Sequence, residues 1–243
     1  MKIYSNIDTK SVTREAGRRL TEQLAKTKKS ILLLLSGGSA LDVLKSVDVS
    51  VIDTRVTIGL VDERYTKDSL KTNFLSLLRH PFFIPALRNG ARLIDPTTGY
   101  KESIKDEAKR LDRSYKKWMI EHKNGSIICT AGIGLDGHTA GIFPMPDDAS
   151  GFQKRFIDTQ NFVVGYHAGK NVDVPDRVTS TLSFIKKFAH VILYTVGENK
   201  RPALEKLCST KGGIEETPGR VYRELPPDSV CLFTDQTNLR YAL

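Results

Sequence analysis

The chain has 243 residues, of which 40% are hydrophobic and 27% are charged, a balance that excludes collagen-like, low-complexity and largely disordered proteins. A chain of this length buries enough apolar surface to fold without disulfides or a structural metal. Lysine and arginine outnumber aspartate and glutamate by 37 to 28, which gives a net charge of +9. This charge predicts an anionic partner, such as a small phosphorylated or carboxylated molecule.

Nucleic acid is another anionic partner, but the basic residues occur in scattered pairs such as Arg18-Arg19, without a long basic run or interleaved aromatic residues. We therefore expect no nucleic-acid binding. The longest strictly aliphatic run, Ile31–Leu35, has five residues, whereas a membrane-spanning helix needs ~20. The first eight residues lack a signal-peptide pattern, so we expect a cytoplasmic protein without a membrane segment.

The cysteines give no sign of a covalent or metal-bound framework. Cys129, Cys208 and Cys231 are odd in number, widely spaced and without a CxxC pair. This pattern argues against both a disulfide framework and a zinc cluster. We expect three small buried thiols.

The N-terminal part of the chain predicts a helix. An apolar residue at every fourth position from Val12 to Leu24 indicates an amphipathic helix that ends near Lys28. Thr9 or Ser11 is available as its N-cap.

A glycine loop follows the first predicted strand. The continuous apolar run Ile31–Leu35 predicts a strand buried on both faces of a parallel sheet, and Ser36-Gly37-Gly38-Ser39 ends it before a helical pattern over 40–47. The loop lacks the lysine of a P-loop and is not GxGxxG, so a nucleotide is not indicated. Its glycines, hydroxyls and helix N-terminus nevertheless suit an anion. The alternative is a tight turn without a ligand.

A charged triplet ends the second predicted strand. Residues 56–61 form this strand, Asp62-Glu63-Arg64 follows it, and apolar spacing from Leu70 to Leu78 indicates a helix that ends before Pro81. The triplet could be a solvated surface run. At the carboxyl end of a buried strand, however, it would place a guanidinium suited to oxyanions over a binding site.

Strands and helices alternate along the rest of the chain. This alternation predicts an α/β fold with an open, mostly parallel, doubly wound, Rossmann-like sheet that has helices on both faces, in a single domain over 1–243. We expect further strands at 91–94, 126–130, 162–165, 191–196 and 230–234, and further helices at 104–119, 183–188, 200–209 and 218–225.

The segment after the predicted strand 126–130 is the most informative one. Three glycines surround Asp136 and His138 within residues 132–140. Glycines allow a tightly bent backbone, which would hold the imidazole beside a carboxylate that sets its tautomer. Because ligands bind at the carboxyl ends of strands in such sheets, we expect this segment, the glycine loop and the charged triplet to meet in one site.

At this point the residues resemble a known family. The run 134–144, Gly-Leu-Asp-Gly-His-Thr-Ala-Gly-Ile-Phe-Pro, is similar to the signature of the 6-phosphogluconolactonase family, within the superfamily that includes glucosamine-6-phosphate deaminase. The same family has, in the same order, the Ser-Gly-Gly-Ser loop, the Asp-Glu-Arg triplet followed by Asn73, Arg177-Val178-Thr179, and Gly197 with Lys200. The resemblance runs from Leu32 to Asp235.

Two positions depart from the patterns of the resemblance. Ala40-Leu41 stands where the family tends to have Thr-Pro, which removes a hydroxyl that would help to hold phosphate. Phe143 stands where the catalytic glutamate of the deaminases would be. The second departure favours the lactonase activity.

The resemblance implies hydrolysis of 6-phosphoglucono-δ-lactone to 6-phosphogluconate in the oxidative pentose phosphate pathway, without a metal or other cofactor. It implies that His138 is the general base, that Asp136 orients it or is structural, and that Arg64 stabilises the oxygens of the substrate. Substrate and phosphate binding would fall to Ser36, Gly37, Gly38, Ser39, Asp62, Arg177 and Lys200.

Two other functions stay open at this point. One is a sugar-phosphate isomerase or deaminase on the same scaffold, and the other is a non-enzymatic sugar-phosphate sensor of the kind found in transcription regulators. The residues before Ile31 are too few for the helix-turn-helix of such a regulator. A covalent serine mechanism lacks a G-x-S-x-G elbow, and the oligomeric state stays undetermined.

Overall fold

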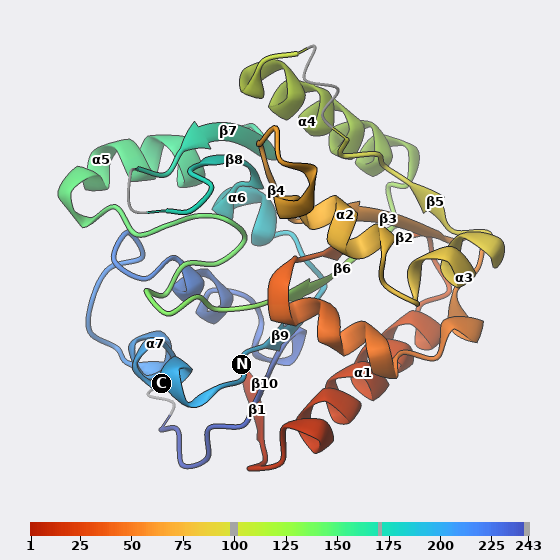
Figure 1. Cartoon of the computed structure of the whole chain (residues 1–243), viewed down its shortest axis with the longest axis horizontal. Coiled ribbons are helices and arrows are strands. Elements are labelled where there is room, and N and C mark those ends of the chain that lie inside the picture. Colours follow the sequence, from red (N-terminus) through yellow and green to blue (C-terminus); the bar gives the residue numbers. More distant parts are fainter. Residues whose placement is uncertain (98–101, 170–171, 241–243) are drawn as a thin grey trace.

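The computed structural model of the protein describes residues 1–97, 102–169 and 172–240 and has a parallel seven-stranded sheet at its centre (Figure 1). All the strand pairs of this sheet are parallel. The predicted α/β architecture is thereby confirmed. In spatial order the strands are β1 (Lys2–Ser5), β10 (Val230–Thr234), β9 (His190–Tyr194), β6 (Ser126–Ala131), β2 (Ile31–Leu35), β3 (Val56–Leu60) and β5 (Arg92–Leu93).

The order of the strands fixes where a ligand can bind. From β2 the chain moves outward through β3 to β5, and β6 then returns to the other side of β2 before the chain continues to β9 and β10. The direction of winding therefore reverses between β2 and β6. Doubly wound sheets bind ligands at this reversal, outside the carboxyl ends of the strands. The glycine loop follows β2 and the Asp136–His138 segment follows β6, so both lie at this point.

Each face of the sheet carries its own hydrophobic core. On β2, Leu32 and Leu34 point into one core while Ile31, Leu33 and Leu35 point into the other, as expected from the two-residue period of a strand. The helices α1 (Thr9–Lys26) and α3 (Phe83–Arg88) pack in the second core, and α4 (Ile104–Glu121), α6 (Leu182–Ile185) and α7 (Arg201–Cys208) pack in the first. Figure 1 shows α1 and α4 on opposite sides of the sheet.

The predicted N-terminal helix forms, but its N-cap differs from the prediction. α1 begins at Thr9, and the carboxylate of Asp8 accepts hydrogen bonds from the backbone N–H groups of Lys10 and Ser11. An aspartate satisfies two free donors of the first turn and its charge is favoured at this end of a helix, so it replaces the hydroxyls of Thr9 and Ser11 as the cap.

A second, antiparallel sheet of three strands was not predicted. It consists of β4 (Asp62–Arg64), β8 (Asp176–Ser180) and β7 (Val163–His167) in the order β4-β8-β7. The charged triplet, which was expected only to end the preceding strand, is therefore a short strand of its own. Arg64 of β4 lies directly opposite Arg177 of β8. The small sheet thus brings together two arginines that are more than a hundred positions apart in the sequence.

Several helical segments also differ from their predictions. The helix expected over 70–78 is divided into a 3-10 turn, Ser69–Lys71, and α2 (Asn73–Leu78), because the side chains of Asp68 and Thr72 each cap a new start. The pattern at 40–47 is a 3-10 helix that begins earlier, at Gly38, and runs to Ser46. The segment at 218–225 is a 3-10 helix, Pro218–Arg223, and α5 (Ala149–Phe152) was not predicted.

Within the described residues, none of the helices combines the length and the hydropathy that crossing a bilayer requires.

Glu107 of α4 makes the stability of the fold dependent on pH. Its side chain is buried, and neither carboxyl oxygen has a hydrogen-bond partner among the described residues. Burial raises the pKa of Glu107 from 4.5 to about 8. The folded protein therefore keeps a proton that the unfolded chain releases, so this group lowers the stability progressively as the pH rises from about 4.5 to 8.

We expect the isosteric Glu107→Gln variant to be more stable than the parent by about 1–2 kcal/mol at pH 9, and to gain much less at pH 5. Urea unfolding at the two pH values measures the difference. Glu121→Gln on the same helix, where the side chain is 54% exposed, is the matched control and should show no such dependence. Equal effects of Glu107→Gln at both pH values would contradict a charge-based cost.

Candidate active site

A cavity of about 480 Å³ opens where the segments after β2, β3 and β6 converge. It lies at the winding reversal of the large sheet, next to the small sheet. All the residues that were predicted for the site line it, namely Ser36, Gly37, Gly38, Ser39, Asp62, Arg64, Asp136, His138, Arg177 and Lys200. Their roles there stay proposals. Asn73 and Phe143 also line the cavity and had no predicted role.

His138 and Asp136 form a hydrogen-bonded pair in this cavity. The Nδ1 atom of His138 lies 2.6 Å from Oδ1 of Asp136, which also accepts the backbone N–H of His138 at 3.0 Å. Burial raises the pKa of Asp136, but the hydrogen bond and the charge of His138 outweigh it, so the net shift is downward. An ionised carboxylate only accepts, so Nδ1 carries the proton. The Nε2 atom is thereby left as the basic nitrogen of the ring.

Gly134 leaves the space that the imidazole occupies. A Cβ atom at Gly134 would lie 2.1 Å from Nδ1 and Cε1 of His138, closer than any real contact. The N–H of Gly134 also donates to the carbonyl of His138 at 2.8 Å, which closes the loop. Only glycine permits this close approach.

The chain turns sharply just after His138. Thr139 and Ile142 exchange two backbone hydrogen bonds, of 3.3 and 2.8 Å, around Ala140 (φ 50°) and Gly141 (φ 67°). Two consecutive positive φ angles are the mark of a type I′ turn, the favoured connection of a tight hairpin. The flanking positions of this hairpin are His138 and Phe143, so the turn brings their side chains together.

Asp62 is a buried carboxylate on the adjoining wall of the cavity. Its Oδ2 atom lies 3.7 Å from Nη1 of Arg177 and accepts the side-chain amide of Asn73 at 3.3 Å. Burial raises the pKa of Asp62, whereas the charges of Arg177, Arg64 and His138 oppose the rise. The Nε–H groups of both arginines are buried without a partner among the described residues. Two guanidiniums with unused donors thus face one cavity.

Glu63 points away from the cavity, unlike its two neighbours in β4. Its carboxylate accepts the backbone N–H groups of Arg64, Asn73 and Phe74 at 2.6–2.7 Å. Burial raises the pKa of Glu63 to about 7, and these hydrogen bonds oppose the rise. The side chain therefore fixes the start of α2, and with it Asn73, rather than contacting a ligand.

The glycine loop and Lys200 complete the lining. Gly37 packs so closely against the side-chain amide of Asn73 that a Cβ atom would lie 2.1 Å from its oxygen. Gly38 has a φ of 63° and nothing within 4 Å of an added Cβ, so its backbone faces open space. The Nζ atom of Lys200 donates to the carbonyl of Ile133 at 2.9 Å. Burial lowers the pKa of Lys200, and Asp136 opposes this shift.

Comparison with known proteins identifies the family. The family model described as glucosamine-6-phosphate isomerases/6-phosphogluconolactonase matches residues 7–226. The chain belongs to this family.

The relatives of this chain include proteins named 6-phosphogluconolactonase and a protein named glucosamine-6-phosphate deaminase. The chain is 28% identical over 227 residues to a 6-phosphogluconolactonase of Xylella fastidiosa, with 89% of this chain and 87% of the relative covered. It is 27% identical over 208 residues to a glucosamine-6-phosphate deaminase of Staphylococcus saprophyticus, with 79% and 81% covered. A crystal structure of the 6-phosphogluconolactonase of Shewanella baltica has a TM-score of 0.74 at 21% identity, covers 96% of both chains, and shows the same fold.

On the expectation that His138 is the general base, Gly134→Ala should displace the imidazole and lower the rate of catalysis by about tenfold, because small misplacements of a catalytic group are costly. Gly132→Ala is the matched control in the same loop, since its Cβ would meet the carbonyl oxygen of Tyr194 at 3.3 Å and the Cβ of Ala40 at 4.0 Å, and not the imidazole. Steady-state rates and thermal unfolding should be measured for both. A fully active Gly134→Ala protein would mean that the position of His138 observed here is not the active one.

Proposed function

We propose that this chain hydrolyses 6-phosphoglucono-δ-lactone to 6-phosphogluconate, the activity that its lactonase relatives are named for. The observation that carries the proposal is the His138–Asp136 pair, which keeps a basic Nε2 in a cavity with three cationic side chains, Arg64, Arg177 and Lys200. A lactone carbonyl is already electrophilic. Its hydrolysis therefore needs a base, donors for the oxyanion and a hold on the phosphate.

In the proposed mechanism, Nε2 of His138 takes a proton from a water molecule as the water oxygen bonds to the lactone carbonyl carbon. The imidazole becomes an imidazolium, and Asp136 stabilises it through Nδ1. The bond between the carbonyl carbon and the ring oxygen then breaks, and Nε2 returns its proton to that oxygen. The proton taken from water is thus transferred to the ring oxygen, His138 is neutral again, and the product is the open-chain acid.

Cationic side chains and backbone donors bind the remaining parts of the substrate. Arg64 stabilises the oxygens at the reacting end, where the unused Nε–H donor of its guanidinium suits a developing negative charge. The Ser36–Ser39 loop, Arg177 and Lys200 hold the phosphate, and Asp62 orients Arg177 and accepts from substrate hydroxyls. The open backbone at Gly38 supports this use of the loop.

The deaminase alternative is less well supported by the cavity. Its described lining contains two carboxylates, Asp62 and Asp136, and both are engaged with a cationic or imidazole partner. Phe143 stands where the resemblance places the catalytic glutamate of the deaminases. Without that carboxylate, opening and deamination of an amino sugar lack one of their catalytic groups.

The two activities can be tested on the same preparation. Freshly generated 6-phosphogluconolactone should lose its lactone in the presence of the protein much faster than it does spontaneously, and glucosamine-6-phosphate should release no ammonia above background. Ammonia release with no acceleration of lactone hydrolysis would reverse the assignment.

A further inference from the structure

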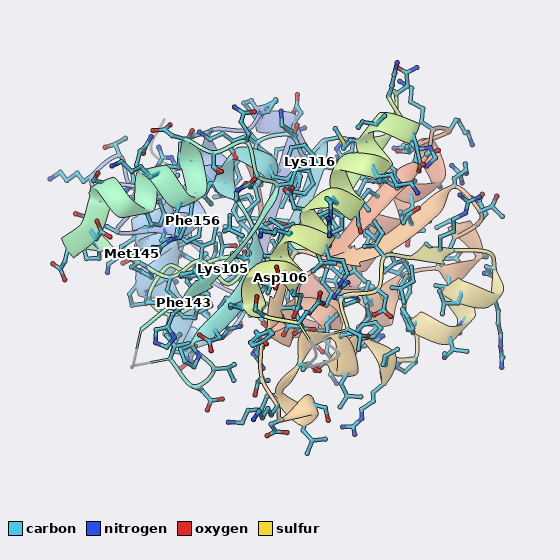
Figure 2. All side chains as sticks on the ribbon, turned by 90° about the horizontal axis from the view of Figure 1, so that it is seen from above. Lys105, Asp106, Lys116, Phe143, Met145 and Phe156 are labelled. Carbon is cyan, nitrogen blue, oxygen red and sulfur yellow. The ribbon has the colours of Figure 1, made fainter. Side chains whose placement is uncertain are left out.

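The ring of Phe143 lies against the imidazole of His138. The two ring centroids are 4.3 Å apart and the planes are inclined at 34°, so His138 lies over the face of the phenyl ring rather than at its edge. The guanidinium carbon of Arg177 lies 5.4 Å from the same centroid. Figure 2 labels Phe143 on the side of the molecule that also carries Met145 and Phe156.

The turn and its hydrogen bonds fix the position of Phe143. The type I′ turn over 139–142 sets it opposite His138, and its N–H donates to the hydroxyl of Tyr166 at 3.0 Å. That hydroxyl donates in turn to the carbonyl of Gly141 at 2.7 Å. The hydroxyl of Thr179 donates to the carbonyl of Ala140, which supports the left-handed conformation of a residue other than glycine.

We propose that the face of the Phe143 ring stabilises the imidazolium that His138 becomes in the transition state, which makes Phe143 a positioning and charge-stabilising residue. The inference rests on the proposed lactonase function for its effect on the rate. It extends that function to a residue that carries no proton and no charge.

The physical basis is the quadrupole of the aromatic ring. A cation within about 6 Å of the centroid and over the face of a ring is attracted to it, and neutral imidazole gains much less. The contact is therefore stronger after His138 has taken the proton than before. Only interactions that are stronger in the transition state than in the ground state accelerate a chemical step. The usual strength of a cation–π contact corresponds to a factor of about 2 to 30 in kcat.

Other charges near His138 set the background for this effect. Asp136 holds Nδ1, and Asp62, Arg64 and Arg177 line the wall formed by β4 and β8. The charge of Arg177 is offset by Asp62 at 3.7 Å. Lys200, beyond Asp136, is the remaining cation of the described lining. Of these groups only Arg177 also contacts the phenyl ring, so an alteration of the ring that keeps its shape acts on His138 and Arg177 alone.

The test keeps the shape of the side chain and removes its quadrupole in steps. Phenylalanine with one, two and three fluorine atoms on the ring is incorporated at position 143, and the same series at Phe233, a buried core position, is the control. We expect kcat to fall stepwise by a total of about 2- to 30-fold on both phosphorylated and unphosphorylated lactone in the Phe143 series only. An effect through Arg177 would instead raise KM for the phosphorylated substrate.

A second readout does not depend on activity. The pH midpoint of the imidazole NMR signals of His138, identified by their loss in His138→Ala, should move stepwise to lower pH across the Phe143 series without substrate. An unchanged midpoint and unchanged kcat across the series would overturn the proposal, even if Phe143→Leu is inactive. If the unmodified protein does not hydrolyse lactones, the proposed function fails, and the NMR midpoints alone decide whether the ring stabilises the cation.

Discussion

Replacing His138 with alanine is expected to lower kcat/KM for 6-phosphogluconolactone by 10²- to 10⁴-fold, the usual cost of losing a general base. The reason is that Nε2 is the nitrogen left free by the hydrogen bond from Nδ1 to Asp136. The side chain of His138 is 33% exposed, so its removal leaves no buried void and should change the thermal stability little.

Initial rates corrected for spontaneous hydrolysis, together with thermal unfolding, measure both effects. Asp136→Asn is the informative companion, because an amide can bind Nδ1 in the wrong tautomer and should lose activity while the fold persists. A His138→Ala protein with a rate close to that of the parent would remove His138 from the mechanism.

The second large effect concerns the phosphate. Arg177→Ala and Lys200→Ala should each lower kcat/KM for 6-phosphogluconolactone by roughly 10- to 150-fold, equivalent to ~1.5–3 kcal/mol for a charge-assisted contact. Most of the loss should appear in KM, because a remote group that is bound equally in the ground and transition states contributes uniform binding.

Unphosphorylated gluconolactone supplies the control substrate for both variants. It lacks the group that the cations are proposed to bind, so the variants should differ little from the parent on it. Because Arg177 pairs with Asp62 and Lys200 binds the carbonyl of Ile133, the two cations come from different walls of the cavity and can be tested separately. Equal losses on both substrates would show that they do not recognise phosphate.

The large sheet could be predicted because its strands are recognisable from their own residues as apolar runs. Ile31–Leu35 is apolar at every position, and Val230–Thr234 has the bounds that its sequence predicts. Such runs are typical of parallel strands buried on both faces. The winding reversal then follows from the chain order, and it places the glycine loop beside the Asp136–His138 segment.

Of the small sheet only β7 was predicted, as the strand at 162–165, because β4 and β8 depend on distant partners. Asp176–Ser180 is polar, yet Thr179 is fully buried, since its hydroxyl binds the carbonyl of Ala140 and its backbone pairs with Asp62. No local pattern contains this information. For the same reason the triplet at 62–64 was not predicted to be a strand, and Glu63 was not separated from its neighbours, although the alternation of side chains in a strand turns it to the opposite face.

The contact of Phe143 with His138 was not predicted, for a related reason. In the sequence Phe143 is one apolar residue in a run, and its contact with His138 depends on two consecutive positive φ angles. The signal that could have indicated this contact is the pair Ala140-Gly141 between Thr139 and Ile142, which is a candidate for a two-residue hairpin loop.

The most direct test of His138 as the general base is the acceleration of 6-phosphogluconolactone hydrolysis over the spontaneous rate, measured from pH 5 to 8 with the unmodified protein and His138→Ala side by side. We expect a large acceleration near neutral pH that declines as the solution becomes acid, because a protonated imidazole cannot accept a proton from water. His138→Ala should lack both the acceleration and its pH dependence. An acceleration that is the same in the two proteins, or is flat over this range, would contradict this role of His138.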